Sequence, residues 1–256
     1  MTETPAPPLI FPSELVQTLR SAHRVVVLTG AGISAESGIP TFRQAQTGLW
    51  TQYRAEDLAT PEAFRKNPRL VWEWYAWRRN IIANSKPNPA HLALVKLEDQ
   101  IPNFTLITQN VDNLHQTAGS RKIIEFHGNI FRTKCSNENR VVETWFDTGE
   151  VPPRCPSCNH FLRPDVVWFG ELISEAALSA AFRSVQDCQV FISIGTSGLV
   201  EPAASLPRLA LQHESLLVEI NLEPTPLTHQ ADFILQGLSG RIIPQLIAKV
   251  WPDLQP

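Results

Sequence analysis

A glycine-rich turn directly after an apolar run contains the first residues whose types and spacing could do chemistry. The run, residues 24–28, reads RVVVL. Gly30, Gly32 and Ala35 then fit the spacing G-x-G-x-x-G/A. A buried strand that ends in such a turn and starts a helix brings backbone N–H groups to one point, where a pyrophosphate can bind. The alternative is a tight strand-to-helix turn that binds no ligand.

Polar side chains also end two later apolar runs. Gln109, Asn110 and Asp112 end or follow FTLITQ, and His127 ends KIIEFH. Open α/β sheets bind ligands at the carboxyl ends of their strands. Neutral imidazole takes up a proton readily near pH 7, so His127 is a candidate general base. Taken alone, Asn110 and Asp112 read as helix-capping residues, and His127 as a histidine that ends a strand.

The four cysteines, at positions 135, 155, 158 and 188, indicate a metal site. Cys155-Pro-Ser-Cys158 is half of a tetrahedral zinc site, and Cys135 precedes it by 20 residues, a spacing compatible with structural zinc. In a chain without an export signal, cysteines favour metal binding or packing over disulfides. Cys188 stands alone beside an apolar run and is expected to be a small core residue.

The elements that must position these residues alternate along the chain. Apolar runs with little polar alternation predict buried strands of a parallel sheet, separated by helices. No convincing strand occurs between residues 41 and 100. From 132 to 163 the apolar periodicity breaks down, which predicts a small extended insertion. The fold class is therefore α/β, a Rossmann-like doubly wound parallel sheet with a smaller domain formed by insertions. Strands are predicted at 24–28, 104–109, 122–127, 190–194, 216–220 and 233–235. Helices are predicted at 13–22, 61–83, 175–186, 203–213 and 240–250, and one more follows the break at 86–89 and ends at Gln100. Ser13 is the expected cap of the first helix.

Composition limits the classes of protein to which the chain can belong. It has 256 residues, of which 43% are hydrophobic and 18% charged, enough to bury one large core. The formal net charge of -3 argues against nucleic acid or an anionic membrane as a partner. No apolar run reaches the roughly 20 residues that span a bilayer. The N-terminus has no export signal, so we expect a cytoplasmic protein, of undetermined oligomeric state.

Five separate motifs, in a fixed order, resemble one protein family. They are GAGISAESGIPTFR from residue 30, TQNVDNLH from 108, His127-Gly128-Asn129, VVWFGE from 166 and GTS from 195. Over residues 25–250 the chain resembles a sirtuin, a NAD-dependent protein-lysine deacylase. The resemblance implies a Rossmann-like large domain and a small zinc-bearing domain, with NAD and acyl-lysine meeting in the cleft between them.

The resemblance also implies a division of the chain. Two insertions into the NAD-binding domain would form the small domain, one helical and one similar to a zinc ribbon. The expected parts are a flexible tail at 1–12, the NAD-binding domain at 13–45, 101–130 and 164–256, the helical insertion at 46–100, and the zinc-ribbon-like insertion at 131–163.

In the reaction that the resemblance implies, the acyl oxygen attacks the nicotinamide ribose, and nicotinamide and O-acyl-ADP-ribose are released. NAD is consumed as a co-substrate. His127 would be the base that deprotonates a ribose hydroxyl, and Asn110 and Arg43 would be the other catalytic residues. Phe42 would shield the reacting ribose. The remaining residues expected to bind NAD are Gly30, Ala31, Gly32, Ala35, Glu36, Thr41, Trp50, Gln109, Asp112, Gly195, Thr196, Ser197, Asn221, Leu222, Glu223 and Ser239.

The partners that the resemblance implies are acylated lysine side chains of proteins. Two segments would hold the substrate peptide between them as an added strand, and backbone pairing of this kind implies loose sequence specificity. The residues of these segments are Val167, Trp168, Phe169, Gly170, Glu171, Gly198, Leu199 and Val200.

The segment WEWYAWRR bears on the acyl group. Tyr75 and Arg78 are three residues apart on a predicted helix, so they share a face and together could hold a carboxylate. From spacing alone, an amphipathic helix with a solvated arginine is the more common interpretation. Tyr-x-x-Arg nevertheless matches the sirtuins that remove succinyl and malonyl groups, and Ala59 matches the small residue that widens their acyl pocket.

The metal site departs from the family pattern. The fourth cysteine of the family would fall at position 138, where this chain has Glu138. A carboxylate can bind zinc, and His160 is the other nearby candidate. We expect a structural zinc ion bound by Cys135, Cys155, Cys158 and one of these two residues; the alternative is a degenerate site that binds no metal.

Other functions fit parts of the pattern. A dehydrogenase would need a second strand that ends in an acidic residue about twenty positions after the glycines; Glu56 and Asp57 stand at that distance, but no predicted strand precedes them. The His-Gly-Asn triplet also counts against a dehydrogenase. A NAD-sensing or zinc-ribbon scaffold would not need His127, Asn110 and Arg43. Mono-ADP-ribosyl transfer shares the first chemical step with deacylation and stays an alternative, as does a deacetylase without preference for acidic acyl groups.

Overall fold

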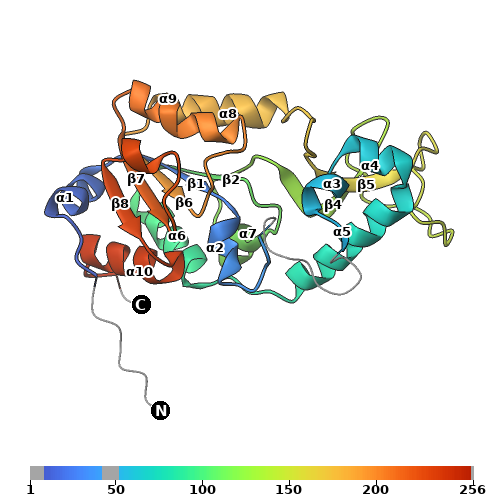
Figure 1. Ribbon diagram of the computed structural model, residues 1–256. Helices are drawn as coiled ribbons and strands as arrows, with labels where there is room; N and C mark the ends of the chain where they lie inside the picture. The colour runs from blue at the N-terminus through green and yellow to red at the C-terminus, as the bar shows by residue number, and fades with distance from the viewer. Residues whose placement is uncertain (1–8, 42–51, 255–256) are drawn as a thin grey trace, which may run out of the picture.

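The computed structural model describes residues 9–41 and 52–254. A six-stranded parallel sheet forms its larger part, with the strand order β3-β2-β1-β6-β7-β8 (Figure 1). All strands are parallel, but the chain adds β2 and β3 on one side of β1, and β6, β7 and β8 on the other. The gap between the ends of β1 and β6 is therefore the topological switch point, where such sheets bind ligands. The strands are β1 (Arg24–Thr29), β2 (Asn103–Thr108), β3 (Ile123–Glu125), β6 (Val190–Ile194), β7 (Leu216–Asn221) and β8 (Phe233–Gln236).

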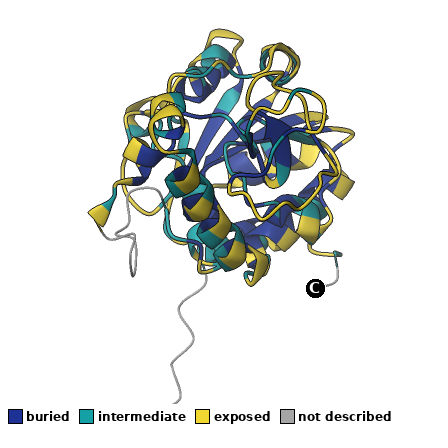
Figure 2. Cartoon of the chain, turned by 90° about the vertical axis from the view of Figure 1, so that its right-hand side faces the viewer, coloured by how far each residue is buried: buried dark blue, intermediate teal, exposed yellow. Residues whose placement is uncertain are grey.

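Helices cover both faces of this sheet, so its central strands are mostly buried, as the dark blue strands of Figure 2 show, whereas the two outer strands are partly exposed. Successive strand residues point to opposite faces. Val25 and Val27 pack in one apolar layer, and Val26 and Leu28 pack in the other. The uninterrupted apolar runs of the sequence follow from this double burial. The first layer includes α1 (Ser13–Ser21), α6 (Pro89–Gln100) and α10 (Ser239–Val250), and the second includes α8 (Glu175–Gln186) and α9 (Leu206–Gln212).

A smaller region lies at one end of the molecule, on the right of Figure 1. Its sheet pairs β4 (Gly128–Cys135) with β5 (Leu162–Val166) in antiparallel fashion. The largest side chains of its core are Trp74, Tyr75 and Trp168. Three helices belong to it: α3 (Ala55–Leu58), α4 (Pro61–Lys66) and α5 (Pro68–Ala83).

Two helical predictions are wrong in detail. The helix predicted at 61–83 is two helices, because Asn67 ends α4 and its side chain accepts a hydrogen bond from the Leu70 N–H at 3.1 Å, at the start of α5. Ser13 does not cap α1, since Pro12 occupies the cap position and no side chain caps this helix. The predicted absence of a strand between residues 41 and 100 holds for the described part of that segment.

The position of α6 bears on the division into domains. Ala93, Leu94 and Leu97 of this helix pack in the same apolar layer as Val25 and Leu106 of the large sheet. The division stays a prediction, and this packing favours a boundary before α6 instead of after it. Among the described residues, the helices are all too short or too polar to cross a membrane.

Candidate active site

A cavity of about 780 Å³ opens between the large sheet and the smaller region. The carboxyl ends of β1, β2, β6 and β7 supply one wall, through Gly30, Gln109, Gly195 and Asn221. Residues of the smaller region supply the other wall. The sheet therefore delivers the strand-end residues to one place, as parallel pairing requires.

Two glycines make the close packing at the strand ends possible. The Gly32 N–H, at the start of α2 (Ala31–Ala35), donates to the Gly195 carbonyl at 2.8 Å. A Cβ on Gly32 would lie 2.7 Å from the Gly195 Cα and carbonyl oxygen. Gly195 has a φ of 59°, and a Cβ there would lie 2.5 Å from the Ile33 nitrogen. The contact is between two backbones, so neither position has room for a side chain.

Asn110 and Asp112 are fixed by hydrogen bonds to the same turn. The Asn110 side-chain amide donates to the Gly30 carbonyl at 3.0 Å and to the Ser34 hydroxyl at 3.1 Å. The Ser34 hydroxyl donates to Asp112 at 2.6 Å, and Asp112 also accepts from the Leu114 N–H at the start of α7 (Leu114–Ala118). Burial raises the pKa of Asp112, and these hydrogen bonds oppose the shift. The hydrogen bonds therefore connect the ends of β1 and β2.

His127 lines the cavity from the connection between β3 and β4, directly before β4 begins at Gly128. Its Nδ1 lies 3.0 Å from the Gln109 carbonyl oxygen. A carbonyl only accepts hydrogen bonds, so Nδ1 carries the proton and Nε2 of the neutral ring keeps its lone pair. Burial lowers the pKa of His127, more than the hydrogen bond raises it. The imidazole is therefore neutral at pH 7 and can accept a proton.

Tyr75 and Arg78 of α5 line the opposite part of the cavity, together with Ala59. All three are buried, with exposed fractions of 1%, 8% and 3%. Burial lowers the pKa of Arg78, while the neighbouring Tyr75 and Asp112 oppose this shift. Burial raises the pKa of Tyr75 above its usual range. This wall therefore holds a buried guanidinium and a protonated phenol.

The segment after β5 connects the base to this wall through backbone hydrogen bonds. The Val167 N–H donates to the His127 carbonyl at 2.9 Å, and the Phe169 N–H donates to the Ala59 carbonyl at 3.0 Å. Phe169 is 44% exposed, whereas Trp168 is 2% exposed. The segment thus presents Phe169 at the mouth of the cavity and buries Trp168.

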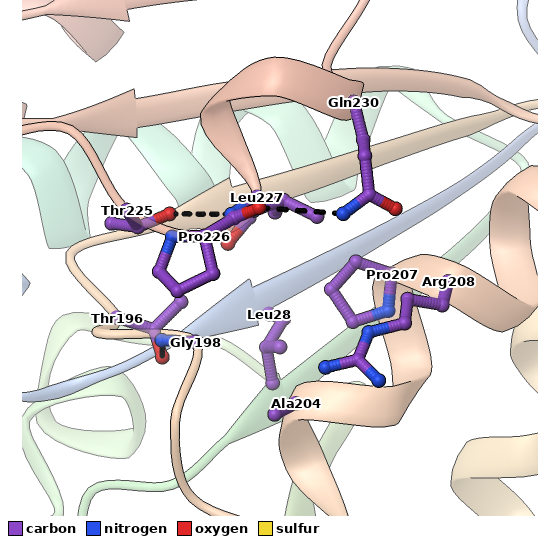
Figure 3. Close-up of a pocket in the computed structure, with 11 residues that line it drawn as sticks. Leu28, Thr196, Gly198, Ala204, Pro207, Arg208, Thr225, Pro226, Leu227 and Gln230 are labelled. Carbon is purple, nitrogen blue, oxygen red and sulfur yellow. Dashed lines mark hydrogen bonds between the residues drawn. The ribbon is translucent and has the colours of Figure 1, made fainter.

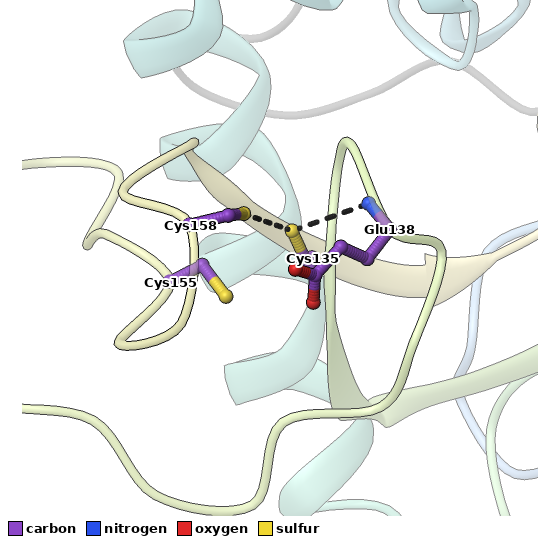
Figure 4. A group of neighbouring side chains, drawn as sticks. All are labelled: Cys135, Glu138, Cys155 and Cys158. Carbon is purple, nitrogen blue, oxygen red and sulfur yellow. Dashed lines mark hydrogen bonds between the residues drawn. The ribbon is translucent and has the colours of Figure 1, made fainter.

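Three cysteines and a glutamate converge in the smaller region (Figure 4). One ligand atom from each of Cys135, Glu138, Cys155 and Cys158 lies within 4.8 Å of the others. The Cys135 and Cys158 sulfurs are 3.3 Å apart and do not form a disulfide. Three thiols and a carboxylate at this spacing fit a tetrahedral structural zinc ion. His160 is not part of this cluster.

Comparisons with known proteins place the chain in a family. The model of the Sir2 family matches residues 30–202. The chain belongs to the Sir2 family. A NAD-dependent protein deacylase of Pyrococcus furiosus is 48% identical over 244 residues, which cover 93% of this chain and 97% of the relative. A NAD-dependent protein deacylase of Aquifex aeolicus is 54% identical over 209 residues, covering 81% and 87%.

The solved structure of a Sir2 homolog in complex with NAD is similar to this sirtuin throughout. Its TM-score is 0.89 at 44% sequence identity, and the match covers 98% of each chain. The Rossmann-like fold predicted from the sequence is confirmed by this likeness and by the strand order. The glycine turn and the strand ends are the residues of this cavity that could hold a dinucleotide.

Most predicted site residues line the cavity of this sirtuin. Phe42, Arg43 and Trp50 lie outside the described residues. Among the described ones, Ala35, Glu36 and Ser239 do not line the cavity; instead, Ser239 donates to Glu36 at 2.8 Å. The predicted residues that do line it are Gly30, Ala31, Gly32, Thr41, Ala59, Tyr75, Arg78, Gln109, Asn110, Asp112, His127, Val167, Trp168, Phe169, Gly170, Glu171, Gly195, Thr196, Ser197, Leu199, Val200, Asn221, Leu222 and Glu223.

Gly198 borders a second, much smaller pocket, behind the end of β6 (Figure 3). Leu28, Ala204 and Pro207 form its floor, and Thr225 and Gln230 lie across from them. Its volume of about 20 Å³ is close to that of one water molecule. It is therefore too small for a nucleotide, and Gly198 stays a predicted contact of the substrate.

Ser34 is a site residue that sequence reasoning missed. It lies in the glycine turn, and its hydroxyl connects Asn110 to Asp112. The sequence signal for its role is that Ser34 lies within the first turn of the helix after the glycines, where its hydroxyl can bind the polar residues Asn110 and Asp112 that follow β2. The sequence does not show which of the turn's residues faces β2.

Proposed function

We propose that this sirtuin is a NAD-dependent protein deacylase that removes succinyl and malonyl groups, together with acetyl groups, from lysine side chains. The observation that carries the deacylase assignment is the hydrogen bond between His127 Nδ1 and the Gln109 carbonyl. It orients a neutral imidazole inside a cavity that also contains the glycine turn. Relatives named as NAD-dependent protein deacylases support the assignment.

His127 would act through Nε2. Bound NAD would supply the ADP-ribose group that accepts the acyl group, and nicotinamide as the leaving group. The lone pair on Nε2 would take the proton of a ribose hydroxyl, while Nδ1–H stays bonded to Gln109. A base whose pKa lies below 7 is already unprotonated at neutral pH, as general-base catalysis requires.

The residues at the strand ends would bind and orient the dinucleotide. Gly30, Ala31 and Gly32 line the cavity at the strand ends and would lie against the pyrophosphate, and Asn110 and Asp112 are held rigidly beside them. Ser197 and Asn221 line the part of the cavity away from the smaller region and would contact the adenosine end. Positioning of this kind accounts for a large share of the rate in bisubstrate reactions.

The substrate peptide would lie along the cavity mouth as an added strand. The segments at 167–171 and 199–200 both line the cavity. A solved Sir2 structure, with a TM-score of 0.79 at 32% identity, contains a deacetylated p53 peptide and 3′-O-acetyl ADP ribose. Pairing through the backbone would give loose sequence specificity.

The preference for acidic acyl groups rests on Tyr75 and Arg78. A buried guanidinium gains most from a carboxylate partner, because a water-poor site screens the charges weakly. A succinyl or malonyl carboxylate could accept hydrogen bonds from Arg78 and from the Tyr75 hydroxyl, whereas an acetyl group has no such acceptor. Ala59 lines the same wall and is small enough to leave room for the longer acyl chain.

Mass spectrometry of acetyl-, malonyl- and succinyl-lysine peptides, with and without NAD, tests this function. Wild type should remove all three acyl groups only when NAD is present. Arg78→Met should lower the succinyl-to-acetyl ratio of kcat/KM by about 10- to 100-fold, the usual loss for a hydrogen bond to a charged group. Arg79→Met is the matched control, since Arg79 instead donates to the Ile130 carbonyl at 2.9 Å, and should leave the ratio unchanged.

The two parts of the proposal fail separately. Peptide masses that do not change in the presence of NAD would contradict the deacylase assignment. NAD-dependent deacylation with the same succinyl-to-acetyl ratio in wild type and Arg78→Met would contradict the acidic-acyl preference alone.

A further inference from the structure

A buried hydrogen bond joins the acyl end of the cavity to the segment after β5. The Trp168 indole Nε1–H donates to the Tyr75 hydroxyl at 2.9 Å, and the two residues are 93 positions apart in sequence. Both side chains are at most 2% exposed, and both residues line the main cavity. This hydrogen bond therefore lies where the end of the acyl chain would be bound.

The bond determines what the Tyr75 hydroxyl can do. An indole N–H only donates, so the hydroxyl must use one of its lone pairs to accept it. The single phenolic proton then points to another acceptor, and the described residues show no hydrogen bond in which the Tyr75 hydroxyl donates. Burial holds the pKa of Tyr75 above its usual range, so the phenol keeps this proton at neutral pH. The direction that stays open for it is the cavity.

Trp168 is itself held from two sides. The Arg163 guanidinium carbon lies 3.2 Å from the centroid of the Trp168 ring, and Arg163 donates two hydrogen bonds to Glu171, at 2.5 and 2.9 Å. Glu171 in turn accepts the backbone N–H of Trp168 at 2.9 Å. Arg163 is 5% exposed, so solvent screens this arrangement little. The position and plane of the indole are therefore fixed before any substrate binds.

We propose that Trp168 is a positioning residue for acyl-group selectivity, which acts by orienting the Tyr75 hydroxyl toward the carboxylate of an acidic acyl group. This inference rests on the proposed function of Tyr75 and Arg78. Without the indole donor, the Tyr75 hydroxyl could rotate and lose its fixed direction. A chain of two hydrogen bonds also polarises the phenol, which strengthens its donation to a carboxylate.

Trp168→Phe tests the inference, because it keeps an aromatic ring and removes the N–H. The ratio of succinyl to acetyl kcat/KM should fall about fivefold, the usual effect of one neutral hydrogen bond, mainly through a higher KM for succinyl-lysine peptide. In the Tyr75→Phe background the same substitution should change the ratio no further, since coupled residues are not additive. Trp251→Phe, at the C-terminal end of α10, is the control and should leave the ratio unchanged.

A second measurement does not depend on how well Trp168→Phe folds. The indole ¹⁵N–¹H resonance of Trp168 should shift in Tyr75→Phe, and in wild type on addition of succinyl-lysine peptide more than on addition of acetyl-lysine peptide. An unchanged kcat/KM ratio in Trp168→Phe, or an equal fall in both backgrounds, would overturn the inference while the Arg78 effect stands. A wild type whose ratio does not depend on Arg78 would overturn the proposed acyl preference and this inference together.

Discussion

The six-stranded sheet and the two-stranded β4–β5 sheet are stabilised in different ways. The large sheet has an apolar layer on each face, to which the helices that cover that face contribute side chains. The core around the cysteines contains four buried residues, Cys135, Val142, Cys155 and Leu162. So small an apolar core contributes little stability by itself, and a bound metal is the usual supplement.

Charged groups sharpen this difference. On β4, Arg132 contacts Asp165 of β5 at 2.9 Å and Glu125 of β3 at 2.5 Å. Lys134 reaches the same Asp165 at 3.6 Å. These ion pairs are partly exposed, so each contributes modestly. We therefore expect the large sheet to be most sensitive to changes in its close packing. In the small sheet, Ile130 and Val166 pack in the core around Trp74, so only its cysteine end should depend on a bound ligand.

The largest expected effect comes from adding one methyl group at the strand ends. In Gly32→Ala the new Cβ meets backbone atoms of Gly195 at 2.7 Å, and backbone cannot move aside as a flexible side chain can. We expect a loss of stability of about 2–3 kcal/mol and a fall of at least about 100-fold in NAD-dependent kcat/KM. Denaturant unfolding and steady-state nicotinamide release measure the two effects.

Gly38→Ala is the control for that substitution. Gly38 has a φ of 82°, and a Cβ there would meet no atom within 4 Å. It should cost about 1 kcal/mol of stability through backbone strain and leave the KM for NAD unchanged. A Gly32→Ala protein with the wild-type KM for NAD would contradict the assignment of this turn to the nucleotide.

Removing a cysteine ligand should damage the small sheet selectively. Cys155→Ser should weaken zinc binding by about 100-fold, taking one of four ligands as about a quarter of a typical site's binding free energy. Hydrogen exchange should then accelerate in β4 and β5 and stay slow in β1 and β6. Metal analysis of purified protein measures occupancy.

Cys188→Ser is the matched control, because Cys188 lies outside the cluster and its sulfur contacts the Ser215 hydroxyl at 3.3 Å. This variant should retain its zinc. A wild-type protein that is purified without metal, and that is nevertheless folded and active, would show that the cluster does not need an ion.

The parts of the structure that the sequence predicted share a physical cause. Strands buried on both faces produce continuous apolar runs, and a turn that packs against another backbone requires glycine, so β1, β2 and the Gly30–Gly32 turn could be identified locally. The cysteine pattern identified the metal cluster in the same way. In each case the constraint acts on residues that are close together in the sequence.

The parts that the sequence did not predict depend on distant contacts. The hydrogen bond from Trp168 to Tyr75 joins the segment after β5 to α5. The two residues are far apart in the sequence, and no sequence pattern indicates that they are in contact. The assignment of α6 to the large apolar layer depends on its packing against α10. The break at Asn67 had a local signal, the Asn-Pro pair, which was outweighed by the apolar pattern on both sides.

An effect on stability alone, without a change in catalysis, is expected from two histidines buried beside the large sheet. His91 is fully buried, and burial lowers its pKa to about 4; its ring lies 4.8 Å from that of His115, whose pKa burial also lowers. The unfolded chain binds a proton at His91 near pH 6.5, whereas the folded chain does not until about pH 4. Stability should therefore be lost as the pH falls through this window, by about 3 kcal/mol from His91.

His91→Gln isolates this contribution. His91 Nδ1 accepts the Asn88 N–H at 3.3 Å in the capping box of α6, and glutamine can accept the same bond. The variant should lose about 3 kcal/mol less stability than wild type between pH 7 and pH 4, measured by urea unfolding at each pH. His229→Gln, at an exposed histidine, should follow the wild-type curve. Parallel curves for wild type and His91→Gln would show that His91 is not a neutral buried group, and the large sheet would then depend on charge more than its apolar layers indicate.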